Sequence, residues 1–582
     1  MEISNSKIAK ILRNVAAAYT IKGIGNIFQI RAYENAADAI EHSTASIHDL
    51  WEERKLGNLP GVGQALQGYL DELFKKGKVS HFESVQKGIP QIVFDLLDIP
   101  GIGPKSAEKI ARSGIKSLEA LKKGLKSGEL LKKGISAKLG QNILIGLQEV
   151  SQRTGRVLLP YAAAQADKIL AYLKKCPDVI DAHPLGSLRR MVATVGDLDF
   201  SASSTSPKSI IKHFTKMPGI ARVMDEGESK ATVVLESGLQ VDLLVGQPDS
   251  YGALLQHFTG SKSHNIHLRT LAEKDHLSLS EYGVKNTKAG KRVSTKTEEE
   301  FYKLLGMQTP PPEIREDWGE IEAALQHKLP DLIQLKDIKG DLHTHSNYPI
   351  DSPSHAPGVN SIEDIVKKAQ ELGYEFIGIS DHPPGFGTTS REEKLKWVQM
   401  RTKVIQNIKK STKSIRVLNG LEIDILGDGK LSVPDEALAT LDYCIAGIHS
   451  GHRGTKDVVT RRLLAALENP HVDIISHPTN RLLNERQSSE ADWEQIFKAA
   501  AKKKKLLEIN GYPNRLDLRD DLVRQAKAYE VKFIINTDAH RVDQMDNMRF
   551  GVSVARRGWV EKRNIVNSWD WADFARLFNL TP

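Results

Sequence analysis

The second half of the chain repeats one pattern, in which a short apolar run ends in histidine, aspartate or glutamate and a helical segment follows. Examples are GDLHTHS from Gly340, GISDHPP from Gly378 and FIINTDAH from Phe533. Strands that alternate with helices form parallel sheets, and the carboxyl ends of such strands meet on one rim. The pattern therefore predicts a β/α barrel over residues 339–582, with these polar side chains gathered at its rim.

The residue types at these strand ends suit metal ions. A single histidine in this setting is more often a hydrogen-bonded structural residue. Six histidines at matching strand ends, together with Glu422 and Asp538, favour a multinuclear metal site; the histidines are His343, His345, His382, His449, His477 and His540. Imidazole and carboxylate ligands without thiolate suit Zn²⁺, Mn²⁺ or Fe²⁺, and clusters of such ions generate hydroxide that attacks phosphorus.

The first half contains a second metal-binding pattern, the stretch Gly186–Phe200 (GSLRRMVATVGDLDF). Asp197 and Asp199 stand two residues apart in a strand-like run, so both carboxylates leave the same face. The arginines of GSLRR are suitable donors to phosphate oxygens. A lone DxD is most often a solvated strand end, but Asp242 in LQVDLLV offers a third carboxylate. Three carboxylates with basic phosphate donors favour two-metal phosphoryl transfer.

An internal repeat precedes this region. LGNLPGVGQAL from Leu56 and LDIPGIGPKSAEKI from Leu97 are near copies, and a weaker third candidate spans residues 131–147. A Pro-Gly-x-Gly turn between two helices lets backbone N–H groups approach a phosphate, because glycine has no Cβ in the way. One such turn could be a plain helix connection, whereas the repeat favours helix-hairpin-helix binding to the DNA backbone. The candidate DNA-binding residues are Gly61, Val62, Gly63, Gly101, Ile102, Gly103 and Lys105.

Composition is ordinary for a soluble globular protein, and its charge favours an acidic partner such as nucleic acid. The 582 residues carry a net charge of +8, which favours an acidic partner. Cys176 and Cys444 lie far apart in the sequence, which argues against a disulfide framework and against a CxxC metal site. The sequence shows neither a signal peptide nor an apolar run of membrane-spanning length. We therefore expect a cytoplasmic protein without membrane contact.

Several of these motifs together resemble the family X DNA polymerases, the family of DNA polymerase beta. The resemblance covers residues 1 to about 318 and rests on RAYENAA, the two hairpin turns, GSLRR, GDLDF, VDLLV, FTGSKSHNIHLR and EYGV. It implies that Asp197, Asp199 and Asp242 bind two catalytic Mg²⁺ or Mn²⁺ ions. The nucleotide-binding residues that it implies are Gly186, Ser187 and Arg190 for the triphosphate, His257, Phe258 and Gly260 beside the sugar, Asn265 for the base and Arg269 for the template.

Two positions depart from the family pattern. His257 replaces the tyrosine that usually precedes the phenylalanine of the nucleotide-binding motif, so the sugar selectivity of the family does not simply carry over. Tyr69 stands where polymerase beta has the lysine that forms a Schiff base. Because a phenol cannot form an imine, we do not expect deoxyribose-phosphate lyase activity from that position.

The second half resembles the PHP domain, the polymerase and histidinol phosphatase family, from residue 339 to about residue 570. The resemblance implies a distorted β/α barrel with up to three metal ions. The implied ligands are His343, His345, His382, Glu422, His449, His477, Asp538 and His540. For a ninth ligand we select Asp351, with His355 as the alternative, because the usual short turn is expanded to NYPIDSPSHAPG here.

Other polar residues of this half are expected to support the site or have two alternative roles. Asp381 and Asp424 are expected to orient the ligand imidazoles. Arg481 could bind a substrate phosphate or could be a surface residue. The run Lys502–Lys505 is interpreted as a solvated helix end, with DNA contact as the alternative.

The expected fold class is a multidomain chain with all-α helix-hairpin-helix domains, an α+β nucleotidyltransferase palm with a nucleotide-selecting subdomain, and a C-terminal distorted β/α barrel. The expected domains are 1–80 (N-terminal helical), 81–155 (second helical), 156–250 (palm), 251–318 (nucleotide-selecting), 319–338 (linker) and 339–582 (PHP).

The resemblances imply a monomeric repair polymerase that fills short gaps in primer–template DNA with deoxynucleoside triphosphates. They imply that the PHP domain trims 3′ ends as a 3′–5′ exonuclease, with abasic-site cleavage and removal of 3′ phosphates as further candidate activities. Two alternatives stay open. End processing could dominate while the polymerase half positions DNA, or the chain could be a non-enzymatic scaffold for DNA ends. Retention of both complete ligand sets argues against the scaffold.

Overall fold

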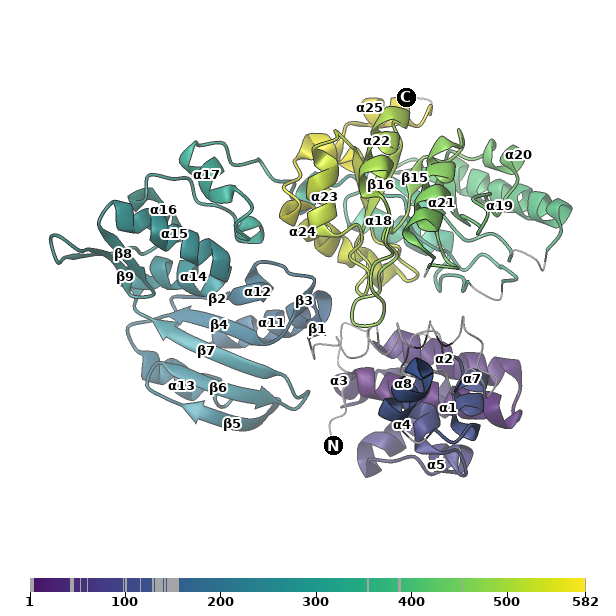
Figure 1. Cartoon of the computed structure of the whole chain (residues 1–582), viewed down its shortest axis with the longest axis horizontal. Coiled ribbons are helices and arrows are strands. Elements are labelled where there is room, and N and C mark those ends of the chain that lie inside the picture. The colour runs from purple at the N-terminus through teal and green to yellow at the C-terminus, as the bar shows by residue number, and fades with distance from the viewer. Residues whose placement is uncertain are drawn as a thin grey trace.

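The structure is a computed structural model, and it describes residues 5–41, 47–52, 54–59, 61–97, 99, 102–115, 117–127, 130, 140, 143, 156–352, 355–385, 389–452 and 454–580. In Figure 1 the N-terminal helices, the palm with its neighbouring subdomain, and the C-terminal barrel appear as separate masses of the chain. The multidomain fold class that we expected is confirmed.

The N-terminal region is helical, and its described residues form two hydrophobic cores. Phe82 and Val85 of α5 belong to the first core, so the boundary that we expected after residue 80 falls at the start of a helix of that core. The second core begins with α6 and includes Ile110. The helices are α1 (Asn5–Lys22), α2 (Ile27–Glu41), α3 (Ile47–Glu52), α4 (Gln64–Lys76), α5 (Ser80–Gln86), α6 (Gln91–Leu97), α7 (Pro104–Arg112) and α8 (Leu118–Lys126).

In the continuously described stretch 156–352, the palm sheet has five strands in the order β2-β4-β7-β6-β5. The central strands β4 and β7 are parallel neighbours, and the other pairs are antiparallel. Phe200 of β4 is buried in one hydrophobic cluster with Ile169 of α11 and Phe214 of α13, so alternation along β4 sends Asp199 to the opposite face. The elements are β1 (Val157–Leu158), α11 (Leu159–Leu173), β2 (Asp181–Pro184), α12 (Gly186–Arg189), β3 (Thr194–Val195), β4 (Leu198–Ser203), α13 (Pro207–Phe214), β5 (Ile220–Glu226), β6 (Lys230–Leu235) and β7 (Gln240–Gly246).

The next subdomain packs helices against a three-stranded sheet within the same described stretch. Buried His264 bonds through Nδ1 to Glu320 (2.5 Å) and through Nε2 to the Tyr302 hydroxyl (2.9 Å). These bonds tie α15, α16 and α17 together. The elements are α14 (Tyr251–Thr259), α15 (Lys262–Lys274), β8 (Leu277–Ser280), β9 (Gly283–Asn286), β10 (Arg292–Val293), α16 (Glu298–Leu304) and α17 (Glu320–Leu325).

The C-terminal half is the predicted barrel. Its described residues contribute seven parallel strands that pair in chain order from β11 to β17. A parallel bridge between Thr344 and Ala539 joins the last strand to the first at the carboxyl ends. Lower in the same gap, the Asn567 side chain donates to the Gly340 and Ile535 carbonyls at 2.7 Å each. The barrel is therefore nearly closed, and its strand ends converge on one rim.

The strands of the barrel are β11 (Gly340–Asp341), β12 (Phe376–Ile379), β13 (Arg416–Asp424), β14 (Tyr443–Gly447), β15 (Ile474–Ile475), β16 (Leu506–Asn510) and β17 (Phe533–Asn536). The helices are α18 (Ile362–Glu371), α19 (Arg391–Ser411), α20 (Asp435–Leu438), α21 (Lys456–Glu468), α22 (Trp493–Lys503), α23 (Asp520–Lys527), α24 (Met548–Arg557) and α25 (Trp571–Leu577). Phe574 of α25 packs in one buried cluster with Phe376 and Tyr443 of the strands. The last helix therefore contributes to a core with barrel-strand side chains.

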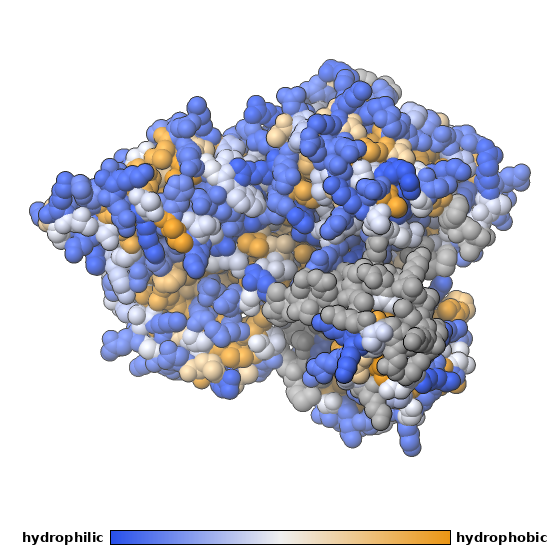
Figure 2. Space-filling view, in the orientation of Figure 1, coloured by the Kyte–Doolittle hydropathy of each residue, from blue (hydrophilic) through white to orange (hydrophobic). Residues whose placement is uncertain are grey.

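The surface drawn in Figure 2 is mostly hydrophilic, with scattered apolar patches. Of the helices described, none has the length and the apolar character that crossing a bilayer requires.

Candidate active sites

The three aspartates of the first half lie together on the palm sheet. Asp199 of β4 and Asp242 of β7 are register partners on adjacent parallel strands, and Asp197 directly precedes β4. Burial, together with the negative charges of Asp197 and Asp242, raises the pKa of Asp199 to about 6. Asp242 accepts hydrogen bonds from Thr232 and from Gln240 (2.7 Å). Three mutually repelling carboxylates form a site that a divalent cation would stabilise.

The GSLRR segment lies against these carboxylates. Gly186 begins α12 with φ +55°, and a Cβ added there would lie 3.2 Å from Asp199 Oδ2. Arg189 is bound to buried Glu298 (2.6 Å), so it connects the palm to α16. Arg190 pairs with Glu316 (3.0 Å) and donates to the Thr259 carbonyl (2.5 Å). Of the two arginines, the expected phosphate donor Arg190 is therefore already held in place beside the nucleotide-binding motif.

The expected sugar and base contacts gather where α14 meets α15. Gly260 has φ +70°, and a Cβ there would lie 3.1 Å from Arg190 Nη1, so glycine permits this approach. Phe258 is 38% exposed, and Asn265 donates to the His257 carbonyl (2.7 Å). Burial lowers the pKa of His257 below its ordinary value. Arg269 is exposed on α15, within the nucleotide-selecting subdomain.

The hairpin turns have the geometry that the repeat predicts where they are described. Gly61 has φ +72°, and Gly63 and Gly103 precede the first turns of α4 and α7. Val62 and Ile102 are buried in the two N-terminal cores, so they anchor the turns instead of reaching outward.

Other members of these motifs are exposed or lie outside the structure's description. Lys105 is exposed on the first turn of α7, and Gly61 is exposed as well. Gly101 and most of the candidate hairpin at 131–147 lie outside the described residues. Tyr69 stacks on His81 with ring centroids 4.8 Å apart.

The rim of the barrel gathers all eight ligands that the sequence implied. Glu422 is at the centre, with Oε2 3.0 Å from His343 Nε2 and 3.1 Å from His382 Nε2. Its Oε1 lies 3.1 Å from His449 Nε2 and 2.8 Å from His477 Nε2. On the other side, Asp538 Oδ1 lies 3.3 Å from His345 Nε2. The nearby imidazoles outweigh the effect of burial and hold the pKa of Glu422 well below its ordinary value.

These side chains form overlapping groups whose ligand atoms lie within 4.8 Å of one another. The groups are His345–His382–His540, His343–His345–Glu422–Asp538, His382–Glu422–His449 and His355–Asp424–His449. Both ring nitrogens of buried His345 have no hydrogen-bond partner within the described part of the chain. Buried polar atoms are normally paired, and an ion would pair these. The donor set therefore fits a cluster of divalent metals.

Our two candidates for a ninth ligand lie in different surroundings. Asp351 is exposed and belongs to none of these four groups. The alternative, His355, lies in one of them, with Nε2 3.1 Å from Asp424 Oδ1. Asp424 also contacts His449 Nδ1 (2.6 Å), so it stands among potential ligands. His355, and not Asp351, therefore lies at the rim beside Asp424, which the residue types of the loop alone do not show.

Two residues that orient ligands were missed in the sequence. Glu508 is fully buried, binds His343 Nδ1 through Oε1 (2.7 Å) and accepts the His477 backbone N–H (2.8 Å). Asn510 donates to Asp538 Oδ2 (3.1 Å). The signal was a charged and a polar residue inside the apolar strand LLEIN. Asp381, expected to orient an imidazole, instead accepts from Ser346 N and Arg401 Nε.

The arginine beside the cluster is Arg515. Its Nε lies 3.4 Å from Asp538 Oδ2, and its buried Nη1 has no hydrogen-bond partner among the described residues. Arg481, the candidate from the sequence, instead donates to the carbonyls of Arg515 (2.8 Å) and Leu516. Arg481 therefore supports the backbone of the arginine that faces the cluster. Lys502 and Lys503 end α22 at the surface, where Lys503 pairs with Glu468.

The two halves are joined through α24. Arg557, 6% exposed, donates to the Arg190 carbonyl (2.8 Å), to Glu316 Oε1 (3.0 Å) and to Asp520 (2.6 Å). Glu316 is also the partner of the Arg190 side chain. A residue of the barrel half thus holds both the backbone and the carboxylate partner of the expected phosphate donor.

Comparisons with known proteins agree with this geometry. Family models match for a helix-hairpin-helix domain (residues 3–79), a SAM-like helix-hairpin-helix tandem (93–149), the DNA polymerase beta thumb (254–316) and the PHP domain (341–511). The chain is 34% identical over 567 residues to the DNA polymerase/3′-5′ exonuclease PolX of Bacillus subtilis (strain 168), covering 96% of this chain and 97% of that protein.

The barrel half has more distant relatives. A probable phosphatase of Caldicellulosiruptor bescii is 30% identical over 190 residues, which cover 31% of this chain and 73% of that protein. A probable phosphatase of Clostridium acetobutylicum is 29% identical over 209 residues, which cover 34% of this chain and 78% of that protein. With similarity to PolX over almost the whole length and matches to both halves, the chain belongs to the family X DNA polymerases that carry a C-terminal PHP domain.

Proposed function

We propose that this chain is a DNA-directed DNA polymerase that fills short gaps during DNA repair and whose PHP domain removes nucleotides as a 3′–5′ exonuclease. The observation that carries the proposal is the presence of two separate sets of candidate metal ligands in one chain that is similar to PolX over 96% of its length. We further propose a monomeric, cytoplasmic protein, with abasic-site cleavage and 3′-phosphate removal as additional PHP activities.

In the palm, Asp197, Asp199 and Asp242 would hold Mg²⁺ or Mn²⁺, which supplies Lewis-acid activation of the primer hydroxyl and of the leaving pyrophosphate. Arg190 and the Gly186–Ser187 turn bind the triphosphate, and Gly260, beside the sugar, permits the close approach of the Arg190 guanidinium. Asn265 and Arg269 lie on α15, from which they contact the nascent base pair. The hairpin glycines bind the DNA backbone, and Tyr69 provides no imine chemistry.

At the barrel rim, the eight side chains that the PHP resemblance implies and His355 would hold up to three Zn²⁺, Mn²⁺ or Fe²⁺ ions, which would supply the Lewis acid for phosphodiester hydrolysis. Asp424 is positioned to join them. Glu508 fixes the His343 ring, and Asn510 fixes the Asp538 carboxylate. Arg515, whose Nε lies 3.4 Å from Asp538 Oδ2, would stabilise negative charge on the phosphate.

The test uses the full chain on two labelled substrates, a one-nucleotide gap and a single strand with a free 3′ end, in Mg²⁺ and in Mn²⁺. We expect extension of the first by one nucleotide and stepwise shortening of the second. Shortening without any extension would support the end-processing alternative. The absence of both reactions would support the scaffold.

Replacing Arg515 by Ala should lower kcat/KM for 3′–5′ degradation about 100-fold, because one preorganised donor to a phosphoryl transition state is worth about that much. Metal content, measured by elemental analysis of the purified protein, should stay unchanged since Arg515 donates no electron pair. Arg515→Lys, which keeps the charge, should recover part of the activity. Gap filling by the same variants reports correct folding, and full exonuclease activity of Arg515→Ala would contradict the role.

Replacing Arg557 by Met should raise the KM for the incoming nucleotide about tenfold, because Glu316 and the Arg190 carbonyl lose a shared buried donor. Exonuclease activity on single strands should stay within about twofold of wild type. The matched control is Arg549→Met, which also removes a palm-to-barrel ion pair, with Asp167 at 3.3 Å, but one exposed to solvent and worth little. Equal KM values for both variants would contradict the coupling.

Metal binding at the palm should weaken as the pH falls below 6. The pKa of Asp199 is raised to about 6 by burial and by its neighbouring carboxylates, so below that pH a proton occupies the carboxyl and the ion must displace it. The Mg²⁺ concentration for half-maximal gap filling should therefore rise about tenfold per pH unit below 6 and stay level above 7. DNA binding at each pH serves as the control, and a constant Mg²⁺ requirement from pH 5.5 to 7.5 would contradict the prediction.

A further inference from the structure

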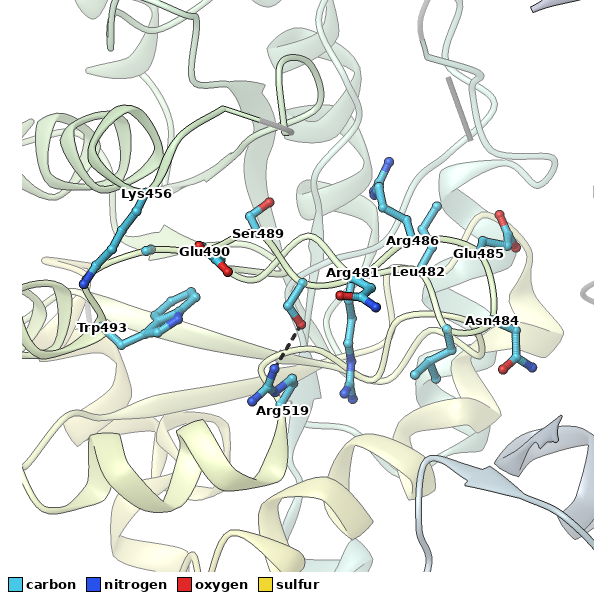
Figure 3. A pocket seen from close by; sticks show the side chains of 14 residues that line it. Lys456, Arg481, Leu482, Asn484, Glu485, Arg486, Ser489, Glu490, Trp493 and Arg519 are labelled. Atoms are coloured by element: carbon cyan, nitrogen blue, oxygen red, sulfur yellow. Dashed lines mark hydrogen bonds between the residues drawn. The ribbon is translucent and has the colours of Figure 1, made fainter. Parts of the chain in front are cut away.

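A pocket of about 830 Å³ lies along the loop 481–491 of the PHP half, outside both metal sites (Figure 3). Its volume falls within the range of about 300–1,000 Å³ that is typical of ligand sites. In Figure 3, Lys456 and Trp493 lie at one end, Asn484 and Glu485 at the other, and Arg519 between them. The pocket is therefore elongated along the loop.

The charge of the lining favours an anion. Lys456, Arg481, Arg486 and Arg519 line the pocket together with Glu485 and Glu490, which leaves an excess of two positive charges. The Arg481 guanidinium is bound to backbone carbonyls, so these contacts use its hydrogens without neutralising its charge. Lys456 is 54% exposed and lies 3.8 Å from Asp492, a loose ion pair that a phosphate can replace at little cost.

A third cation of the lining, Arg519, is fixed in direction. Arg519 forms two parallel bonds with Asp521 (2.9 and 2.5 Å) and donates weakly to Ser488 Oγ at 3.4 Å, the dashed line in Figure 3. Asp521 is not among the residues that line the pocket, whereas Arg519 is. Asp521 thus fixes the orientation of the Arg519 guanidinium, which lies at the pocket wall.

An aromatic ring accompanies the cations. Trp493, in the first turn of α22, stacks on Phe497 with centroids 6.0 Å apart and forms part of the pocket wall beside Lys456. An aromatic face next to backbone-binding cations recognises an unpaired base with its phosphate, as in proteins that bind single strands. In a duplex the base faces are stacked on one another and cannot contact the indole. A free phosphate has no ring that could stack on it.

The position of the pocket connects it to both halves. Arg481 of the pocket donates to the carbonyl of Arg515, and the Arg515 side chain reaches Asp538 of the metal cluster, so Arg515 links the pocket to the barrel rim. Asn484, at the other end, donates to the Arg156 carbonyl (2.6 Å), directly before the first palm strand. A strand bound here would lie between the barrel rim and the polymerase half.

We propose that this pocket binds one or two nucleotides of an unpaired DNA strand whose 3′ end is at the metal cluster, with Lys456 and Arg519 binding phosphates and Trp493 stacking on a base. The inference rests on the proposed exonuclease function, and it assigns the strand-binding site of that function. It predicts that short substrates are degraded poorly because they cannot reach the pocket and the cluster at once.

The first experiment compares Lys456→Gln/Arg519→Gln with wild type in the full chain. We expect the KM for a 15-nucleotide oligo(dT) to rise about tenfold and its dependence on salt to weaken, since each lost phosphate contact removes about 0.7 from the logarithmic salt slope of a single strand. Hydrolysis of bis(p-nitrophenyl) phosphate, which requires only the cluster, and gap filling should not change. The control is Lys498→Gln, a 61% exposed lysine of α22 outside the pocket.

An unchanged KM for oligo(dT) would overturn the proposal, and so would an equal loss on oligo(dT) and on the small phosphodiester. If wild type hydrolyses the small phosphodiester but degrades no oligonucleotide, the exonuclease function fails instead. In that case a direct binding measurement tests whether the pocket binds a DNA strand.

Direct binding uses the Trp493 fluorescence, obtained as the difference between wild type and Trp493→Phe in chelator, where no strand is cleaved. We expect oligo(dT) to quench this difference signal. Half-maximal quenching by dTMP or inorganic phosphate should need at least a tenfold higher concentration. Quenching by dTMP at the same concentration would make the pocket a mononucleotide site, and no quenching by oligo(dT) would exclude strand binding. Either result overturns the proposal.

Discussion

Asp199→Asn is expected to reduce gap filling at least about 1,000-fold and to leave 3′–5′ degradation unchanged. The substitution keeps the shape of the side chain but removes one of three charges that would hold the catalytic ions, and with it the two-metal chemistry. The raised pKa of Asp199 means that burial and the neighbouring carboxylates oppose its charge in the metal-free protein. The neutral amide removes that repulsion, so the inactive variant should not be less stable than wild type.

The measurement is single-turnover extension of a one-nucleotide gap, together with thermal unfolding in chelator. The control is Asp225→Asn, the same change on the exposed edge strand β5 of the same sheet. It should extend the primer at the wild-type rate. Extension by Asp199→Asn within tenfold of wild type would remove the palm aspartates from the mechanism, and with them the polymerase proposal for this site.

Glu422→Gln is expected to abolish 3′–5′ degradation, again by about 1,000-fold or more, while gap filling continues. Glu422 is 1% exposed and its two oxygens lie within 3.1 Å of His343, His382, His449 and His477. An amide cannot supply the negative charge that a cluster of divalent ions at this point requires, since hard and borderline ions need the carboxylate oxygens. The bound metal, measured by elemental analysis, should fall together with the activity.

The control is Glu436→Gln, an exposed glutamate of α20 paired with Arg391. It should keep full activity. Degradation by Glu422→Gln at more than a tenth of the wild-type rate, from protein purified in parallel with wild type, would mean that the cluster is not the nuclease. Together with Asp199→Asn, this variant separates the two reactions of one chain.

The parts of this protein that were predictable are those set by local periodicity. Alternating apolar strands and helices predict a barrel, and the structure has one. Because strand ends share one rim, the same pattern predicted that His343, Glu422 and Asp538 lie close together. The period of two along a strand placed Asp197 and Asp199 on one face. Glycine spacing predicted the hairpins, and Gly61 has the positive φ that such a turn uses.

The positions that the sequence left open between alternatives lie in loops. Asp351 and His355 are four residues apart in one expanded loop, and only its path shows that His355 reaches Asp424. Arg481 follows His477 closely, yet its guanidinium turns to the carbonyl of Arg515, and Arg515 reaches the cluster instead. Long side chains on irregular backbone have no periodicity from which their direction follows.

By itself, the sequence determined the two chemistries, because carboxylates and imidazoles at strand ends are set by residue type and by the fixed periods of strand and helix. Only the tertiary structure decided how the chemistries are joined and completed. The contact of Arg557 with Arg190 spans 367 positions, and that of His343 with Glu508 spans 165. Such contacts depend on how separately folded elements pack, and no local pattern of the chain encodes the distance between two residues that meet only after packing.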